Sequence, residues 1–151
     1  MVTKDEAKSR IHGLVEKYNG LTPVERHRYS EEETKKDFIR PLFHALGWDT
    51  ENSREVSAEE AISGKRVDYG FRINGIPKFF LEAKALRADM ETEKFIDQAI
   101  NYAWHKGCTW AILTDFENIR VFNAEIKAAK PMQSHFFTLQ CEEFLDHFDK
   151  L

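Results

Sequence analysis

Residues 65–84 read KRVDYGFRINGIPKFFLEAK, and this stretch decides the fold. Two runs rich in β-branched and aromatic residues, Val67–Ile73 and Ile76–Ala83, flank the dipeptide Asn74-Gly75. Such a dipeptide between two apolar runs is a strong signal for a β-hairpin. Pro77 indicates that the second strand pairs weakly at its start, because proline cannot donate a ladder hydrogen bond. We therefore predict an antiparallel hairpin at the centre of the sheet.

The hairpin carries three charged residues that a buried element does not need. Asp68 lies near the start of the first strand, and Glu82 and Lys84 lie at the end of the second. Residues two apart on a strand point to the same face. Two converging carboxylates offer hard oxygen ligands for Mg²⁺. A bound Mg²⁺ polarises a phosphodiester, and a nearby lysine can orient water or neutralise developing charge.

The register of the hairpin decides whether the two carboxylates can meet. With a strict two-residue loop, position 68 lies opposite position 81, and Asp68 and Glu82 face opposite sides of the sheet. The metal-site hypothesis therefore requires a loop of odd length or a bulge. We predict a three-residue loop over 73–75 with Gly75 left-handed, which pairs residue 72 with 76 and 68 with 80. Glu82 then lies diagonal to Asp68 on the same face.

The rest of the chain predicts helices and strands around this hairpin. A capping box of Ser30 and Glu33 opens a helix that runs to Leu46, with a kink at Pro41. Hydrophobic spacing predicts further helices over 2–18, 91–106 and 141–151, and strands over 49–56, 110–114 and 119–122. This order predicts an α/β fold, with a mixed central sheet that contains the hairpin and is flanked by helices. We expect one domain over 1–151 with its core at about 30–122.

Composition excludes several classes of function. Lys plus Arg number 22 and Asp plus Glu 26, so the net charge of −4 excludes a basic nucleic-acid coat and leaves a local groove open. Cys108 and Cys141 form no disulfide framework and no zinc spacing. Glycine motifs that bind nucleotides are absent. The sequence has no apolar run long enough for a membrane span and no signal peptide, which predicts a cytoplasmic location.

At this point the sequence resembles a known family. Asp68, thirteen intervening residues and Glu82-Ala83-Lys84 resemble the D…(D/E)-x-K signature of the PD-(D/E)XK nuclease superfamily, with Val67 in place of the proline. The stretches 33–35, 38–43 and 46–49 resemble the N-terminal nuclease domain of type I (R subunit) and type IIG restriction enzymes. The resemblance covers roughly Ser30 to Phe122. It implies a restriction-endonuclease-like core, αβββαβ, in which Pro41 is tolerated.

The resemblance also implies roles at the catalytic centre. Asp68 and Glu82 would be metal ligands and Lys84 the catalytic lysine, with Mg²⁺ as cofactor and Mn²⁺ as its substitute. An acidic residue of the first core helix completes such sites, and Glu33 matches best, with Glu32 as the alternate. For Glu33 the capping role stays open beside the catalytic one, and the two do not exclude each other.

Further residues would support the site or contact DNA. Gln98 and Tyr102 match a Gln-x-x-x-Tyr motif of the second core helix, where they would contact DNA or position Lys84; an ordinary helix edge is the alternative. Lys65 and Arg66 flank the site and could meet phosphates, and simple surface charge is their alternative.

Together these features predict a Mg²⁺-dependent endonuclease domain that hydrolyses DNA phosphodiester bonds. We expect the cleavage module of a prokaryotic restriction-modification enzyme, at the N-terminal end of a larger protein. Its partners would be double-stranded DNA and helicase, methyltransferase or specificity domains or subunits, and a homodimer is compatible with this. The alternatives are a non-catalytic DNA-binding or assembly module on the same fold, since fold does not fix function, and a DNA repair nuclease.

Overall fold

A six-stranded mixed sheet forms the centre of the computed structural model, with its strands in the order β1-β2-β3-β4-β5-β6. The structure describes residues 2–62, 65–86, 93–126 and 131–151, and for 62, 65, 93, 131 and 132 it describes the backbone alone. The strands are β1 (Val56–Ile62), β2 (Lys65–Ile73), β3 (Ile76–Ala83), β4 (Trp110–Thr114), β5 (Asn118–Asn123) and β6 (His135–Gln140). Only β3 and β4 are parallel; the other neighbours are antiparallel.

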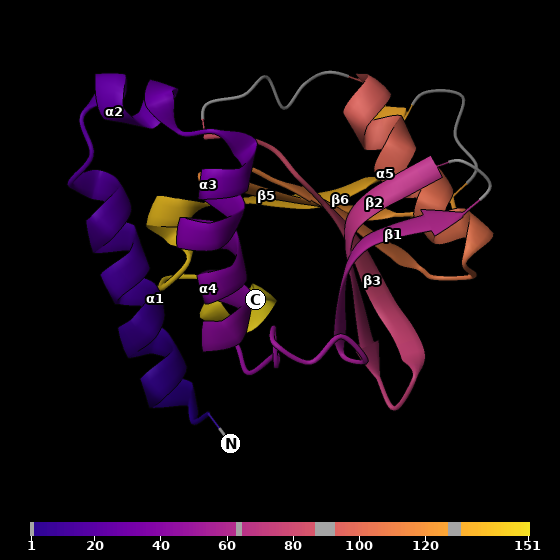
Figure 1. Ribbon diagram of the computed structural model, residues 1–151, viewed down its shortest axis with the longest axis horizontal. Coiled ribbons are helices and arrows are strands. Elements are labelled where there is room, and N and C mark those ends of the chain that lie inside the picture. The colour runs from indigo at the N-terminus through magenta and orange to yellow at the C-terminus, as the bar shows by residue number, and fades with distance from the viewer. Residues whose placement is uncertain (1, 63–64, 87–92, 127–130) are drawn as a thin grey trace.

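Helices cover both faces of this sheet, as Figure 1 shows. On one face lie α1 (Lys4–Asn19), α3 (Glu31–Thr34) and α4 (Arg40–Ala45), and on the other lies α5 (Glu93–His105), which connects β3 to β4. A short α2 (Pro23–Arg28) links α1 to α3. Each face has its own hydrophobic core. The larger one packs α1 and α4 on the sheet around Phe38, Phe71 and Phe116, and the smaller one packs α5 around Phe80 and Tyr102.

The kink predicted at Pro41 is present as a change of helix type. Between α3 and α4 the chain forms a π-helical turn, η1 (Lys35–Ile39), in which the Arg40 N–H donates to the carbonyl of Lys35. Pro41 has no N–H to bond the carbonyl of Asp37, four residues earlier. That carbonyl instead accepts from the Lys17 ammonium of α1, at 3.4 Å. The helix therefore continues through the proline without leaving this backbone group unpaired.

The end of the chain differs from the prediction. The expected helix over 141–151 is wrong, because this segment forms two short 3₁₀ turns, η3 (Cys141–Glu143) and η4 (Phe148–Lys150). Strand β6 and the 3₁₀ turn η2 (Pro131–Ser134) were not expected either. The strand expected at 49–56 lies later, as β1. The remaining predicted helices and strands are present within one or two residues where the structure describes them, and the α/β class is confirmed.

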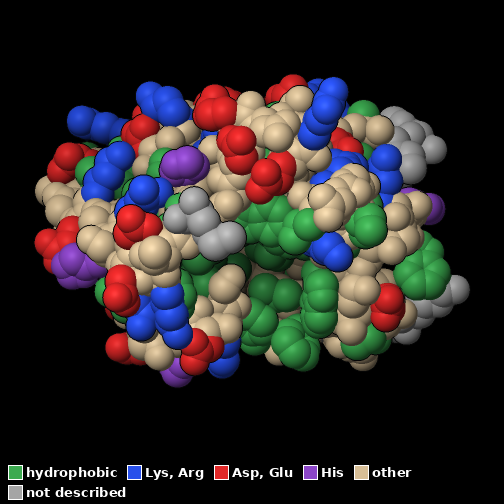
Figure 2. Space-filling view, turned by 90° about the horizontal axis from the view of Figure 1, so that it is seen from below, with side chains coloured by type: hydrophobic (Ala, Val, Ile, Leu, Met, Phe, Trp, Pro, Cys, Tyr) green, Lys and Arg blue, Asp and Glu red, His purple; other side chains and the backbone are tan. Residues whose placement is uncertain are grey.

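One face of the molecule carries a hydrophobic area surrounded by charged side chains. Figure 2 shows hydrophobic side chains gathered in a hollow on the face that carries the N-terminal end of α1 and the tip of the β2–β3 hairpin. Ile73 and Ile76, which flank the hairpin turn, are half-exposed. Strand β3 begins here and ends at the opposite side of the molecule, close to α3 (Figure 1). The charged residues at the end of β3 therefore lie away from this hollow. Among the described residues, no helix has both the length and the apolar character needed to span a bilayer.

Candidate active site

A β-bulge in the hairpin brings Asp68 and Glu82 to opposing positions. The turn is a tight two-residue one: Asn74 and Gly75 both have positive φ, and Ile73 pairs with Ile76. The predicted three-residue loop is therefore wrong. The pairing then shifts by one residue, from 72 opposite 77 to 71 opposite 79, so Lys78 is the extra residue. Tyr69 pairs with Leu81, and the same register places Asp68 directly opposite Glu82.

Asp68 is held by donors from two different elements, β3 and η1. Its Oδ2 accepts the backbone N–H of Ala83 at 2.7 Å, and its Oδ1 accepts the ammonium of Lys35 at 2.9 Å. Burial alone would raise the pKa of Asp68, but hydrogen bonds with Glu82, Lys35 and Ala83 hold it below its usual value. Asp68 is therefore an oriented carboxylate with only 14% of its side chain exposed.

Glu82 is the protonated partner of this pair. Its side chain is buried, and burial, the hydrogen bond with Asp68 and the charge of Asp68 raise its pKa to about 9. Lys84 opposes this rise, and Glu31 adds to it. Two adjacent carboxyl groups cannot both ionise cheaply in a buried site, so one keeps its proton. The Oε2 atom of Glu82 is buried and makes no hydrogen bond to the described residues.

Two lysines lie near the carboxyl pair: Lys35 contacts Asp68 directly, and Lys84 acts on Glu82 through its charge. Lys84 follows β3, and its backbone N–H donates to the Thr114 carbonyl of β4 at 2.9 Å. Its ammonium lies 3.7 Å from the ring centroid of Phe95 on α5, which is cation–π distance. Lys35 comes from η1 and is 8% exposed. Burial alone would lower the pKa of Lys35, but Asp68 and Glu32 raise it above its ordinary value.

The acidic residues that lie nearest to this site on α3 are Glu31 and Glu32. Their carboxylates lie 3.5 Å and 3.2 Å from the Lys35 ammonium. Glu33, which the resemblance favoured, caps the helix instead: its backbone N–H donates to the Ser30 hydroxyl. The structure thus shows half of the predicted capping box at Glu33 and brings Glu31 and Glu32 to the site.

The two motif residues, Gln98 and Tyr102, lie on α5 and contact strands β2 and β3. The Gln98 amide donates to the backbone carbonyl of Arg66 at 2.9 Å, two residues before Asp68. Tyr102 is fully buried against Phe80, with ring centroids 5.0 Å apart, and its hydroxyl has no described hydrogen-bond partner. Burial in this position is incompatible with a DNA contact by the Tyr102 side chain. The structure therefore argues against a DNA contact by Tyr102 and shows Gln98 bonded to the backbone of β2, while positioning of Lys84 stays a prediction.

The flanking cations are less closely tied to the carboxyl pair. Arg66 is 62% exposed and pairs with Glu59 of β1 at 2.9 Å. Lys65 opens β2, and its side chain lies outside the described part of the structure.

Sequence reasoning assigned no role to two residues that help to build the site. Lys35 lies in the quoted motif, and its spacing from Glu31 and Glu32 signals helical ion pairs, but its contact with Asp68 spans 33 residues. Thr34 is fully buried; its hydroxyl donates to the Ser30 carbonyl and accepts the N–H of Leu86. It therefore ties the chain after β3 to α3.

The carboxyl pair fits a divalent cation by its chemistry. It offers hard oxygen donors, including the buried Glu82 oxygen without a hydrogen bond, and a cation there would favour ionisation of both groups. Among the described residues, no group of three or more His, Cys, Asp or Glu side chains is placed to hold a metal. A cation at Asp68 and Glu82 would keep most of its other ligands as water or phosphate oxygens, as Mg²⁺ commonly does.

This sheet, with a carboxyl pair and a lysine at the end of its central hairpin, defines a restriction-endonuclease-like domain. Residues 54–130 match the family model of the type I restriction enzyme R protein N terminus (HSDR_N). The match covers half of the chain, and the chain belongs to this family.

One relative agrees with this membership, and one solved structure agrees with the fold. The chain is 29% identical over 164 residues to the type II restriction enzyme and methyltransferase RM.Eco57I of Escherichia coli, covering 95% of the chain and 16% of that protein. In fold it is similar to the solved fragment of a protein described as the HsdR subunit of a type I restriction enzyme from Vibrio vulnificus. That similarity has a TM-score of 0.51 and 19% identity, over 80% of this chain and 25% of the other. The chain thus corresponds to a module of restriction-modification proteins and spans a small part of their length.

Proposed function

We propose that this chain is the DNA-cleaving module of a restriction enzyme and hydrolyses phosphodiester bonds with a divalent cation, Mg²⁺ or Mn²⁺. The observation that carries the proposal is the meeting of Asp68 and Glu82 across the bulged hairpin, with Lys84 beside them. Family membership supports a restriction-modification role. The double-stranded DNA substrate and the helicase, methyltransferase or specificity partners belong to this proposal, as does cleavage itself.

The side chains divide the chemistry among them. Asp68 and Glu82 would hold the cation, which when bound polarises the phosphate and stabilises negative charge. Lys84 would hold a water molecule near the phosphate and take part in its deprotonation. Lys35 keeps Asp68 ionised and oriented. Thr34 and Gln98 fix the two backbone segments that carry the carboxylates.

A plasmid-nicking experiment paired with a metal-binding measurement tests this proposal. We expect supercoiled DNA to be nicked in Mg²⁺ or Mn²⁺, and the reaction to stop in EDTA. Asp68→Asn should abolish nicking and weaken Mn²⁺ binding, measured by the loss of the free-ion electron paramagnetic resonance signal. Lys84→Ala should abolish nicking while leaving Mn²⁺ binding within about threefold of wild type, since a lysine is not a metal ligand.

The matched control is Glu142→Gln, which removes an exposed carboxylate near the C-terminal end. Wild-type protein that neither binds Mn²⁺ nor nicks DNA would contradict the proposal and leave the non-catalytic module. Nicking that survives Asp68→Asn would contradict the assignment of the site. A preference for branched or damaged DNA over intact duplex would instead favour the repair nuclease.

A further inference from the structure

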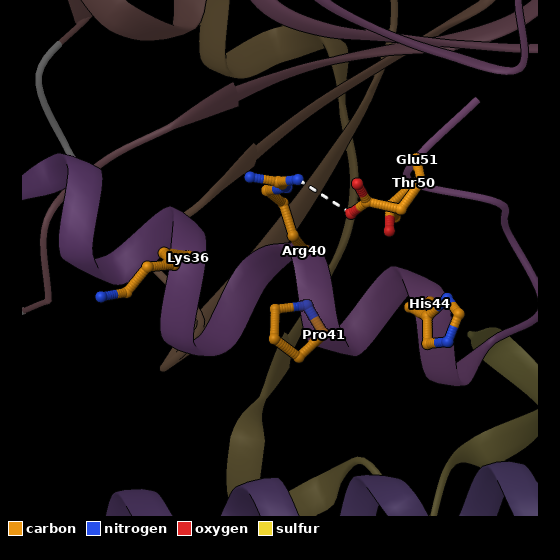
Figure 3. Close-up of a pocket in the computed structure, with 6 residues that line it drawn as sticks. All are labelled: Lys36, Arg40, Pro41, His44, Thr50 and Glu51. Carbon is orange, nitrogen blue, oxygen red and sulfur yellow. Dashed lines mark hydrogen bonds and ion pairs between the residues drawn. The ribbon is translucent and has the colours of Figure 1, made fainter. Parts of the chain in front are cut away.

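A groove lined by basic side chains runs along the outer side of η1 and α4. Lys36, Arg40 and His44 lie at four-residue intervals on this helix, and all three line the groove (Figure 3). Pro41, Thr50 and Glu51 complete its lining, and Glu51 faces Arg40 across it. The groove has a volume of about 390 Å³.

This groove shares part of its lining with a cavity at the candidate active site. A second cavity, of about 210 Å³, is lined by Lys35, Asp68 and Tyr69, and Arg40 and Thr50 line both cavities. The neighbouring lysines 35 and 36 divide accordingly: Lys35 turns inward to Asp68, and Lys36 is mostly exposed and lines the groove. The two cavities therefore adjoin at Arg40 and Thr50, and the second one reaches Asp68 and also contains Glu32 and Glu59.

The spacing of the basic residues suits a polyanion. Four residues of a helix advance by about 6 Å, which is comparable to the distance between successive phosphates on one nucleic-acid strand. Phosphate contacts by Lys, Arg and hydroxyl side chains fix the position of DNA on a protein without reading its sequence. The groove presents two full cations, Lys36 and Arg40, on a chain whose net charge is −4.

Two carboxylates moderate the charge of the groove. Glu51 binds Arg40 at 3.1 Å, and Asp37 lies 3.7 Å from the Lys36 ammonium. Glu51 is 81% exposed, and so its pair with Arg40 is weak and easily replaced by a phosphate. Arg40 can then present its planar guanidinium to two phosphate oxygens at once.

We propose that the groove of Lys36, Arg40, His44 and Thr50 binds the phosphate backbone of the DNA strand whose scissile bond reaches Asp68 and Glu82. This inference rests on the proposed function, because it takes DNA as the substrate. It adds the track along which the strand enters the site. Arg40 lies where the track meets the site and therefore fixes the position of the phosphates next to the one that is cleaved.

Fluorescence anisotropy with a labelled DNA duplex in EDTA tests the track without any cleavage. The affinity of the wild-type chain is measured over a range of KCl concentrations. Each lost phosphate contact lowers the slope of log affinity against log salt by about 0.9. Lys36→Ala/Arg40→Ala should therefore lower the slope by roughly 2 and weaken binding by tenfold or more at low salt. Glu51→Gln should tighten binding, because it removes the carboxylate that competes with phosphate for Arg40.

Lys106→Ala is the matched control, since it removes a partly exposed lysine just after α5, on the other side of the sheet. It should weaken binding less than twofold. Equal affinities and slopes for the groove variant and Lys106→Ala would overturn the track, and so would a wild-type chain that does not bind duplex DNA. Circular dichroism confirms that the variants are folded.

The same variants in the nicking experiment separate the two proposals. Metal-dependent nicking that is unaffected by Lys36→Ala/Arg40→Ala would overturn the track and leave the catalytic proposal standing. Salt-dependent binding through the groove without metal-dependent nicking would overturn the catalytic proposal and leave the track standing.

Discussion

At the scale of single residues, Lys35 is the cation that neutralises the carboxylates of the site. Its ammonium is buried and contacts carboxylates from both α3 and β2. Removal of one partner of a buried ion pair is costly because the other charge stays buried without compensation. Lys35→Met should therefore lower the free energy of unfolding by roughly 3 kcal/mol, measured by urea denaturation at neutral pH.

Lys35→Arg provides the comparison, since it keeps the charge. It should recover more than half of the lost stability, and the pKa of Asp68, followed by carboxyl-resolved NMR, should stay low only in this variant. If Lys35→Met and Lys35→Arg were equally destabilised, steric fit rather than charge would account for the effect.

Glu82, unlike Lys35, makes the fold less stable as the pH rises. The pKa of Glu82 is about 9 in the fold, against 4.5 for the ordinary carboxyl group. Between these two values the unfolded chain releases a proton that the folded chain keeps, so folding stability falls as the pH rises from about 4.5 to 9. Glu82→Gln keeps a hydrogen-bond donor toward Asp68 and cannot ionise. We expect this variant to unfold at a higher temperature than wild type at pH 9 in EDTA, and at a similar temperature at pH 5.

Thermal scans followed by circular dichroism from pH 5 to 9.5 would measure the difference. A constant difference across that range would show that Glu82 does not titrate as described. Saturating Mg²⁺ should raise the unfolding temperature of wild type more than that of Glu82→Gln, because only the glutamate can become a charged ligand.

At the scale of elements, the hairpin shows what a local pattern contains and what it lacks. The Asn74-Gly75 turn and its two strands were predictable, because positive φ at both positions and β-rich flanks are local properties. The bulge at Lys78 was not, because it reflects how β3 packs on β2 and β4 together. The sequence could state only that some irregularity is needed if Asp68 and Glu82 are to meet. The structure shows that this irregularity is a bulge and not a longer loop.

Gly70 is a second place where the hairpin depends on packing. A Cβ atom at this position would collide with the Glu60 carboxylate and the Phe80 ring. Glu60 is mostly buried and bound to Arg72, so it cannot move away cheaply. We expect Gly70→Ala to lower the free energy of unfolding by about 1–3 kcal/mol, as measured by chemical denaturation.

Gly13→Ala is the matched control with the opposite sign. A Cβ at Gly13 meets nothing within 4 Å, and the residue lies inside α1. Alanine should therefore stabilise the chain by about 0.5–1 kcal/mol, because it restricts the unfolded chain in a helix interior. A loss of stability at Gly13 similar to that at Gly70 would contradict the packing argument.

At the scale of the whole molecule, the C-terminal segment shows why hydrophobic spacing alone can mislead. Phe144, Leu145, Phe148 and Leu151 recur every three or four residues, which suits an α-helix and a series of 3₁₀ turns equally well. The structure uses the second solution: the Cys141 N–H donates to the Glu117 carbonyl, and Phe144 is buried against Phe116. The deciding contacts come from the β4–β5 turn, far away in sequence. The Lys35–Asp68 ion pair also joins residues far apart in the sequence, so local patterns do not predict it.

The fold also brings two buried acidic residues to the C-terminal ends of the parallel strands β3 and β4. Glu82 ends β3, and Asp115 follows β4, its parallel neighbour. Asp115 is 1% exposed, and its Oδ1 accepts the N–H of Asn118 at 2.8 Å. Burial raises the pKa of Asp115 to about 7, from 3.8 in an ordinary aspartate. Stability should therefore fall as the pH rises from about 4 to 7, because the unfolded chain binds fewer protons in that window.

Asp115→Asn tests this whole-molecule pH dependence away from the carboxyl pair. The amide oxygen can still accept from Asn118, and the ionisation is removed. Relative to wild type, the variant should gain stability of the order of a few kcal/mol between pH 4 and pH 8, and nothing further above pH 8. Urea unfolding at several pH values measures the gain. Because the pKa of Glu82 is about 9, the double variant with Glu82→Gln should extend the gain in stability to higher pH. Equal profiles of stability against pH for the single and double variants would contradict the presence of two independent buried acids.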